Sequence, residues 1–110
     1  MNDLIPEIQQ KILDLNHSCD QLAKRGADYA YAEKIYRSLL RTEALKMKAE
    51  GYAVGLINMT VYGIDEVATA RLKRDIAEAN YKATQEKINA IKLEIRILDS
   101  QIAREWGRNE

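Results

Sequence analysis

The sequence predicts an all-α protein: a long antiparallel helical hairpin, coiled-coil-like in its packing, that pairs into a homo-oligomeric helical bundle. Two apolar stripes with steps of three and four residues lie toward opposite ends of the chain. A short charge-free segment with three glycines separates them near the middle. Residues three and four apart share one helix face, so each stripe must be buried against another helix. A single hairpin would bury both stripes with one turn.

The first helix is predicted over about 4–50, with Asp3 as its N-terminal cap. Its apolar stripe consists of Ile5, Ile8, Ile12, Leu15, Cys19, Leu22, Gly26 and Tyr29. Gly26 allows two interpretations: a break between two helices, or a small residue that permits close helix approach. A helical glycine costs only about 1 kcal/mol relative to alanine, and the spacing resumes unshifted at Tyr29. Continuity through Gly26 is therefore the preferred prediction.

A connector is predicted over 51–64 and a second helix over about 65–106. The connector combines apolar and glycine residues without any charge up to Gly63, which indicates a buried or partner-facing segment rather than an ordinary polar loop. Asp65 is predicted to cap the second helix and Gly107 to stop it. The second apolar stripe consists of Ile88, Ile91, Ile95, Leu98, Ile102 and Trp106.

A fold point near residue 57 would place residues side by side when their numbers add up to about 115, for example Leu15 and Ser100. Both helices also carry apolar residues outside the two stripes: Leu13, Leu39, Leu45, Ile76, Leu93 and Ile97. A stripe wider than a two-helix contact calls for further helices. A homodimeric four-helix bundle is the simplest arrangement that supplies them.

Composition narrows the possible classes of protein. Lys+Arg and Asp+Glu both number 17, so a charged partner would have to recognise a local patch rather than bulk charge. Hydrophobic residues make up 46% of the chain, which argues against disorder. The single Cys19 excludes an internal disulfide. The sequence shows neither a signal peptide nor an apolar run of about 18 residues, so a cytoplasmic protein that does not cross a membrane is expected.

The sequence offers no catalytic, cofactor-binding or metal-binding motif. The glycines of the connector match neither a phosphate-binding loop nor a dinucleotide fingerprint. Asp14 and His17 form a carboxylate–histidine pair on one helix face, but a metal site of that type needs further inward carboxylates. His17 and Cys19 point to different helix faces and cannot chelate together. The expectation is a protein that is not an enzyme, with no cofactor, no metal and no small-molecule substrate.

Two surfaces near the predicted turn are candidates for binding. Apolar connector residues are costly to leave in water, so a second copy or a protein partner is expected to cover them; they are Leu56, Ile57, Met59, Val61 and Tyr62. A set of basic residues could contact nucleic acid phosphates; it consists of Lys34, Arg37, Arg41, Arg71, Lys73 and Arg74. The competing interpretation is that nearby acidic residues neutralise this basic cluster locally.

The second half of the chain, RLKRDIAEANYKATQEKINAIKLEIRILDSQIAREWG, resembles small helical proteins encoded by phages and prophages of Gram-positive bacteria. The resemblance rests on Arg74-Asp75, the Ala77/Ala79/Tyr81 run, and an Ile/Leu-rich stretch that ends at Arg104-Glu105-Trp106. It implies a viral or mobile-element origin and, in a phage setting, a host or phage protein as partner. The first functional hypothesis is thus a non-enzymatic interaction protein that binds its partner through the apolar tip or the outer helix faces. The alternative is an accessory protein of replication or recombination that binds nucleic acid through the basic cluster.

Overall fold

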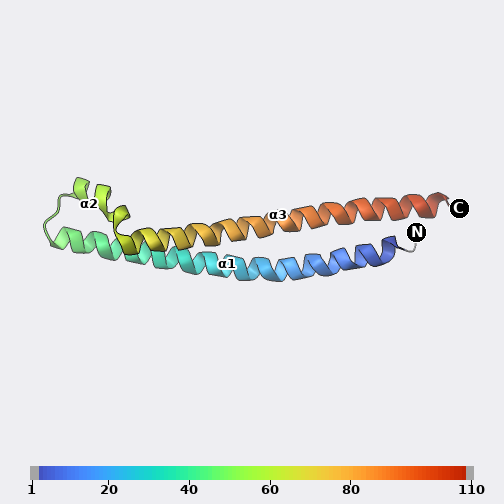
Figure 1. Ribbon diagram of the computed structural model, residues 1–110, viewed down its shortest axis with the longest axis horizontal. Coiled ribbons are helices and arrows are strands. Elements are labelled where there is room, and N and C mark those ends of the chain that lie inside the picture. Colours follow the sequence, from blue (N-terminus) through green and yellow to red (C-terminus); the bar gives the residue numbers. More distant parts are fainter. Residues whose placement is uncertain (1–2, 109–110) are drawn as a thin grey trace. The chain divides into compact units, whose positions relative to one another are not determined.

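The computed structural model describes residues 3–108 and consists of two long helices joined by a short helical connector (Figure 1). In chain order the elements are α1 (Leu4–Ala49), α2 (Val54–Thr60), the 3-10 helix η1 (Val61–Gly63) and α3 (Asp65–Arg108). No strand occurs among the described residues. The all-α prediction is confirmed, as is the prediction of two long helices on either side of the connector, since α1 has 46 residues and α3 has 44.

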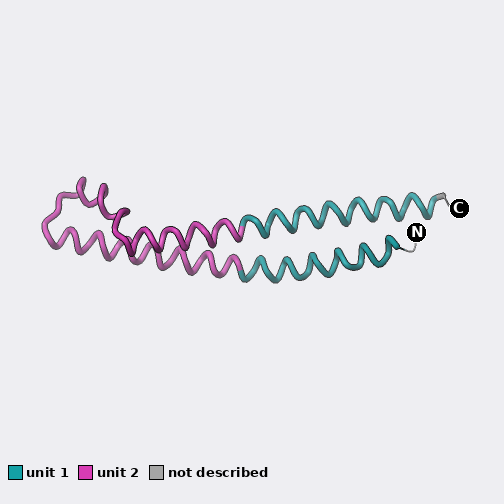
Figure 2. The backbone as a smooth tube through the Cα atoms, viewed as in Figure 1, with its two compact units in different colours: residues 1–24, 82–110 teal, residues 25–81 magenta. Residues whose placement is uncertain are grey.

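Helix α1 and helix α3 run antiparallel in both compact units of the chain (Figure 2). Unit 1 contains residues 1–24 and 82–110, and unit 2 contains residues 25–81. In unit 1, Lys11 of α1 forms an ion pair with Glu94 of α3. In unit 2, Glu33 of α1 lies 3.2 Å from Arg74 of α3. The helix pairing predicted from the two stripes is therefore present in each unit.

The pairing register differs from the predicted one. The partners Lys11 and Glu94 have numbers that add up to 105, and Glu33 and Arg74 to 107, instead of about 115. The Thr60 hydroxyl of α2 lies 3.8 Å from the Met47 sulfur of α1, a pair that follows the observed register. The chain therefore turns back soon after residue 50, and α2 already packs along the last turns of α1.

The turn that ends α1 explains this early reversal. Gly51 has a φ of +92°, a left-handed conformation that glycine adopts without strain. The Gly51 N–H donates to the Lys48 carbonyl at 3.1 Å, and the Tyr52 N–H donates to the Met47 carbonyl at 3.1 Å. These two bonds define a Schellman motif, which satisfies carbonyls that the end of a helix leaves free. One residue type at one position thus stops a 46-residue helix.

Gly26 does not interrupt α1, as predicted. A Cβ atom at this position would lie 3.2 Å from the Tyr81 ring, closer than side chains normally pack. The ring of Tyr81 also lies beside that of Tyr29, with 6.1 Å between the centroids. Gly26 is therefore helical and also makes room for an aromatic side chain of α3.

The helix ends differ in detail from the predictions. Asp3 precedes α1, and its carbonyl accepts a 3.4 Å hydrogen bond from the Glu7 N–H. Asp65 is the first residue of α3 rather than its cap, because the Ile64 carbonyl accepts the first helical bond, from Ala68, at 2.8 Å. Gly107 does not stop α3, which continues to Arg108. A glycine inside the last helical turn reduces the stability of the helix only slightly, so the helix can continue past it when no turn motif ends it.

The core of unit 2 is compact and lies close to the connector. A buried cluster of Tyr36, Val67 and Ala70 is extended by half-buried Leu39, Leu40 and Ile64. Ile57 and Val61 of the connector are also buried. The aromatic, aliphatic and alanine side chains of this unit interdigitate, as a well-packed core requires.

The core of unit 1 confirms the α3 stripe in most positions but only half of the α1 stripe. On α3, Ile88, Ile91 and Leu98 are buried, whereas Trp106 is exposed and Glu105 is half-buried instead. The buried and half-buried α1 residues of this unit are Leu4, Ile8, Lys11, Asp14, Leu15, Ser18, Gln21 and Leu22. The predicted members Ile5, Ile12 and Cys19 are exposed.

The α1 discrepancy has a simple geometric cause. Two helices contact each other along two residue columns per heptad, and this half of α1 carries apolar residues in three adjacent columns. The structure turns inward the column that contains Lys11 and Ser18, and the neighbouring column with Ile5 and Ile12 remains outside. Lys11 tolerates the inward position because its ammonium group bonds to Glu94 while its aliphatic stem covers apolar surface.

Candidate interaction surfaces

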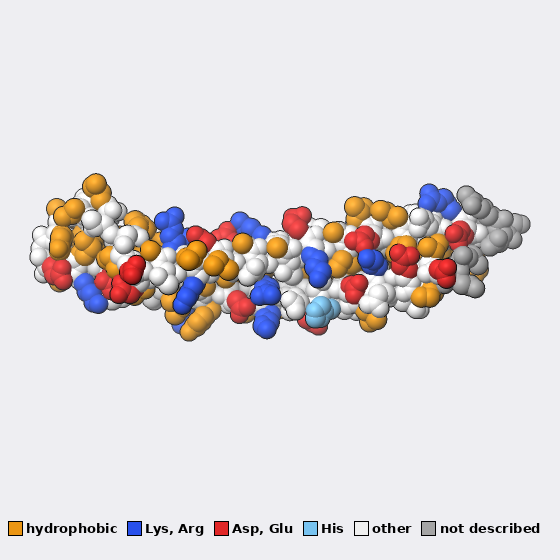
Figure 3. Space-filling model, in the orientation of Figure 1, with side chains coloured by type: hydrophobic (Ala, Val, Ile, Leu, Met, Phe, Trp, Pro, Cys, Tyr) orange, Lys and Arg blue, Asp and Glu red, His pale blue; other side chains and the backbone are white. Residues whose placement is uncertain are grey.

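The connector presents an exposed apolar surface, which we call the tip surface. Its members are Tyr52, Val54, Leu56, Met59 and Tyr62. Exposure reaches 82% for Met59 and 67% for Val54, far above what a covered side chain would show. Figure 3 shows hydrophobic side chains gathered at the surface over α2. Clusters of exposed apolar side chains on a folded protein usually mark interaction sites.

Two of the five residues predicted to bind a partner lie in the core instead. Ile57 and Val61 are 7% and 3% exposed, and the chain itself covers them. The expectation that a second copy or a partner buries Ile57 is therefore wrong. Ile57 and Val61 are four residues apart in the sequence. In a helical connector this spacing puts both side chains on one face, turned away from Met59, so it was the sequence feature that could have predicted their burial. Leu56, Met59 and Tyr62 remain exposed, and Tyr52 and Val54, which sequence reasoning missed, join them.

Arg74 of the predicted basic cluster is occupied within the chain. Its guanidinium lies 3.2 Å from Glu33 and 2.9 Å from Asp75, and 4.6 Å above the centre of the Tyr36 ring. Burial lowers the pKa of Arg74, but the hydrogen bonds to Glu33 and Asp75 and the negative charges of these two carboxylates together outweigh it and leave the pKa above its ordinary value. Arg74 is therefore a packing residue of unit 2 and is poorly placed to meet a phosphate.

Arg37 is also paired, although its side chain is largely exposed. It bonds to Glu33, which thereby holds two arginines at once. The hydrogen bond from Arg37 is the main reason why the pKa of Glu33 lies below its ordinary value, and the bond from Arg74 acts in the same direction. The remaining members of the basic cluster are exposed: Lys34, Arg41, Arg71 and Lys73.

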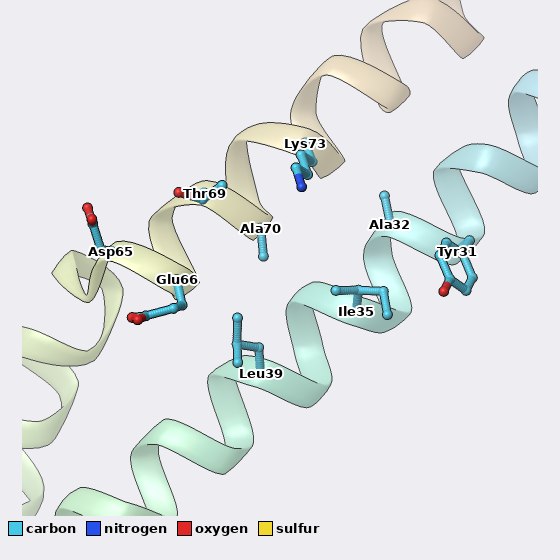
Figure 4. A pocket seen from close by; sticks show the side chains of 9 residues that line it. All are labelled: Tyr31, Ala32, Ile35, Leu39, Asp65, Glu66, Thr69, Ala70 and Lys73. Atoms are coloured by element: carbon cyan, nitrogen blue, oxygen red, sulfur yellow. The ribbon is translucent and has the colours of Figure 1, made fainter.

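A lateral groove of about 610 Å³ runs between α1 and α3 in unit 2. Figure 4 shows Ile35, Leu39 and Ala70 turned into the space between the helices, with Asp65 pointing away from it. The groove exists because small alanines, Ala32 and Ala70, stand at positions where larger side chains would close the gap. Its walls are mostly apolar and bring no nucleophile together with a base, so the groove offers packing surface rather than chemistry.

The structure gathers no three metal-ligating side chains within residues 3–108. Asp14 and His17 share a shallow pocket of about 370 Å³ with Lys11 and Glu94. Lys11 there bonds to Glu94, and this hydrogen bond is the main reason why the pKa of Lys11 is raised. Cys19 is exposed rather than part of the core, contrary to its place in the predicted stripe.

Comparisons of this chain with protein-family models, with curated proteins and with solved structures found no match. Among the described residues, no helix is both long and apolar enough to cross a membrane.

Proposed function

We propose that this protein is a non-enzymatic interaction protein: a self-associating helical hairpin that binds a protein partner through its tip surface. The observation that supports the proposal most strongly is the division of the connector into two faces. Ile57 and Val61 anchor it to unit 2, while Leu56, Met59 and Tyr62 stay exposed. An anchored segment that displays apolar and aromatic side chains loses little conformational entropy on binding, which favours affinity.

The type of partner follows from the chemistry of the tip surface. The connector carries no charge from Gly51 to Gly63, so it cannot attract nucleic acid or an anionic surface by itself. Methionine and tyrosine are enriched in protein interfaces, where they fill apolar pockets and offer a hydroxyl at the rim. The partner is accordingly a protein with an apolar groove. In a phage setting it would be a host or phage protein of the cytoplasm.

Substitutions confined to the exposed face of the connector test this proposal. Met59→Asp combined with Val54→Asp is expected to abolish co-purification of the partner while helical circular dichroism and the melting temperature stay unchanged. Trp106→Asp is the control, because it also places a carboxylate at an exposed apolar residue but in unit 1, and it should retain the partner. A partner that remains bound to the double variant would overturn the role of the tip.

The second candidate function is nucleic acid binding, and the exposure of Lys34, Arg41, Arg71 and Lys73 supports it. Phosphate contacts of this kind weaken steeply with salt. If this function holds, Lys34→Glu with Arg41→Glu should eliminate a low-salt mobility shift of DNA or RNA. Arg74→Gln should change the shift little, because Arg74 is held by Glu33 and Asp75. No shift at low salt with the unaltered protein would exclude this candidate.

A further inference from the structure

Helix α3 carries a second apolar stripe on the face opposite its buried one. We call it the outer stripe; its members are Leu72, Ile76, Ala79, Ala83, Ala90, Leu93 and Ile97. Steps of three and four residues connect them, with Glu86 as the one interruption. Leu93 follows the buried Ile91 by two residues, a rotation of about 200° around the helix. All members are exposed, and the four large ones each expose more than half of their surface.

We infer that a second copy of this chain docks on the outer stripe, with the two α3 helices antiparallel about a twofold axis between residues 84 and 85. This inference rests on the self-association in the proposed function and names the surface responsible. It requires only that α3 is one uninterrupted helix from Asp65 to Arg108, as the structure shows. From Leu72 to Ile97 the contact would extend over roughly 40 Å at 1.5 Å per residue.

The sizes of the side chains fit this axis. Around it, Ala79 meets Ala90 of the second copy and Ala83 meets Glu86. Toward both ends, Ile76 meets Leu93 and Leu72 meets Ile97. Two helices that cross at a small angle approach most closely at the crossing point, where small residues are needed, and separate toward the ends, where large residues fill the wider gap. Antiparallel self-pairing therefore places the alanines near the axis and the bulky apolar residues toward the ends, and Glu86 is the one large residue of the stripe near the axis.

The charges beside the stripe fit the antiparallel arrangement as well. In an antiparallel pair, equivalent flanking positions face each other, which brings Asp75 opposite Arg96 and Lys73 opposite Glu94 of the second copy. The twofold axis repeats each contact, so four pairs of opposite charge form. The other flanking contacts join Asn80 to Lys87 and Lys82 to Asn89, so none opposes like charges.

A parallel pair would be electrostatically poorer. In a parallel pair, a residue beside the stripe contacts the residue five positions later in the other helix. Lys82 of each copy would then face Lys87 of the other, so the same repulsion would occur twice. Such a pair would also separate Asp75 from Arg96. Opposite charges select orientation more reliably than they add affinity, so this pattern favours the antiparallel choice.

The contacts inside each copy leave the pairing groups available. Asp75 bonds to Arg74, and Glu94 bonds to Lys11, but each carboxylate has further acceptor sites for a second cation. Lys73 and Arg96 form no ion pair within the described part of the chain. Glu86, the charged residue of the stripe, would lie across from an alanine and beside Lys82 of the second copy, where its carboxylate can stay hydrated.

Complementary charge variants test the inference. Arg96→Glu places a carboxylate opposite Asp75 of the second copy, and Asp75→Arg places a guanidinium opposite Arg96. Each variant alone therefore opposes like charges and should weaken self-association about tenfold at low salt. An equimolar mixture of the two variants should recover full affinity as a heterodimer, because the variant side chains then face each other as opposite charges. Arg41→Glu, an exposed charge change off the stripe, is the control and should leave the affinity unchanged.

Disulfide cross-linking tests the register directly. In a Cys19→Ser background, Ile76→Cys mixed with Leu93→Cys should give a cross-linked heterodimer under mild oxidation, and Ile76→Cys alone should not cross-link. Efficient linking of Ile76→Cys to itself would show a parallel pair and overturn the inference. If the charge variants dimerise as tightly as the unaltered protein, the outer stripe is not the dimer interface, although the protein still self-associates. A chain that stays monomeric in every test would overturn both, while partner binding at the tip is decided by the separate Met59→Asp and Val54→Asp experiment.

Discussion

Units 1 and 2 are built from the same two helices, but the side chains that they bury differ in kind. In unit 2 the buried α1 residue is the aromatic Tyr36, and the connector adds Ile57 and Val61. In unit 1 the inward face of α1 includes Lys11 and the buried Ser18, opposite the wholly apolar Ile88 and Ile91. The connector thus adds a third element to the core of unit 2, whereas the core of unit 1 consists of side chains from α1 and α3 alone.

The difference shows how little two helices can bury by themselves. Unit 1 leaves Ile5, Ile12 and Leu13 of α1 exposed although they are better core residues than Lys11 and Ser18. On α3, Leu93 and Ile97 are exposed on the opposite face. A helix that is apolar on more than one face is suited to a bundle of more than two helices. Substitutions in the two cores are therefore expected to differ in the size and the sign of their effect on the free energy of unfolding.

The largest effect is expected in the core of unit 2. Ile57→Ala should lower the free energy of unfolding by about 3 kcal/mol, because it opens a cavity beside buried residues. Met59→Ala, two residues further along the same helix, should change it by less than about 0.5 kcal/mol since Met59 is exposed. Urea unfolding of both variants at one protein concentration measures the difference. Equal effects would contradict the division of the connector into an anchored and an exposed face.

In unit 1 a substitution in the core is expected to raise the free energy of unfolding instead of lowering it. Ser18 is 1% exposed and its hydroxyl has no hydrogen-bond partner. Ser18→Ala should therefore raise the free energy of unfolding by about 1–2 kcal/mol, through removal of an unpaired buried polar group and through helix propensity. Ser38→Ala, on the exposed face of the same helix, gains propensity alone, about 0.5 kcal/mol. A Ser18→Ala variant that is no more stable than Ser38→Ala would show that the hydroxyl has a partner.

The smallest expected effect concerns the Glu33 cluster of unit 2. The pKa of Glu33 is lower in the folded protein than its ordinary value, chiefly because of the hydrogen bond from Arg37. Its stabilising contribution is therefore present at neutral pH and is lost as the pH falls below about 5 toward the folded pKa. Glu33→Gln should make the acid branch of the stability–pH curve shallower and leave the alkaline branch unchanged. An acid branch as steep as that of the unaltered protein would refute the pairing of Glu33 with Arg37 and Arg74.

The sequence was sufficient to predict the helical fold, because unbroken steps of three and four residues are a property of the chain itself. Ile88, Ile91 and Leu98 were recognised as core residues for the same reason. It was insufficient to choose between the adjacent α1 columns of Ile12 and Lys11, because that choice depends on the register against α3 and on Glu94. The position of the connector followed from its lack of charge, but its two faces depend on the helix α2, which turns Ile57 inward and leaves Leu56 and Met59 exposed.

The most direct test of the account is the mass of the protein in solution, measured by light scattering during size-exclusion chromatography across roughly 1 to 100 μM. The chain has a mass of 12.6 kDa. We expect a species of twice this mass, shifted toward the monomer by Arg96→Glu and restored when that variant is mixed with Asp75→Arg. A constant 12.6 kDa over the whole range would show that the exposed apolar faces of α1 and α3 do not drive self-association, and it would contradict the account.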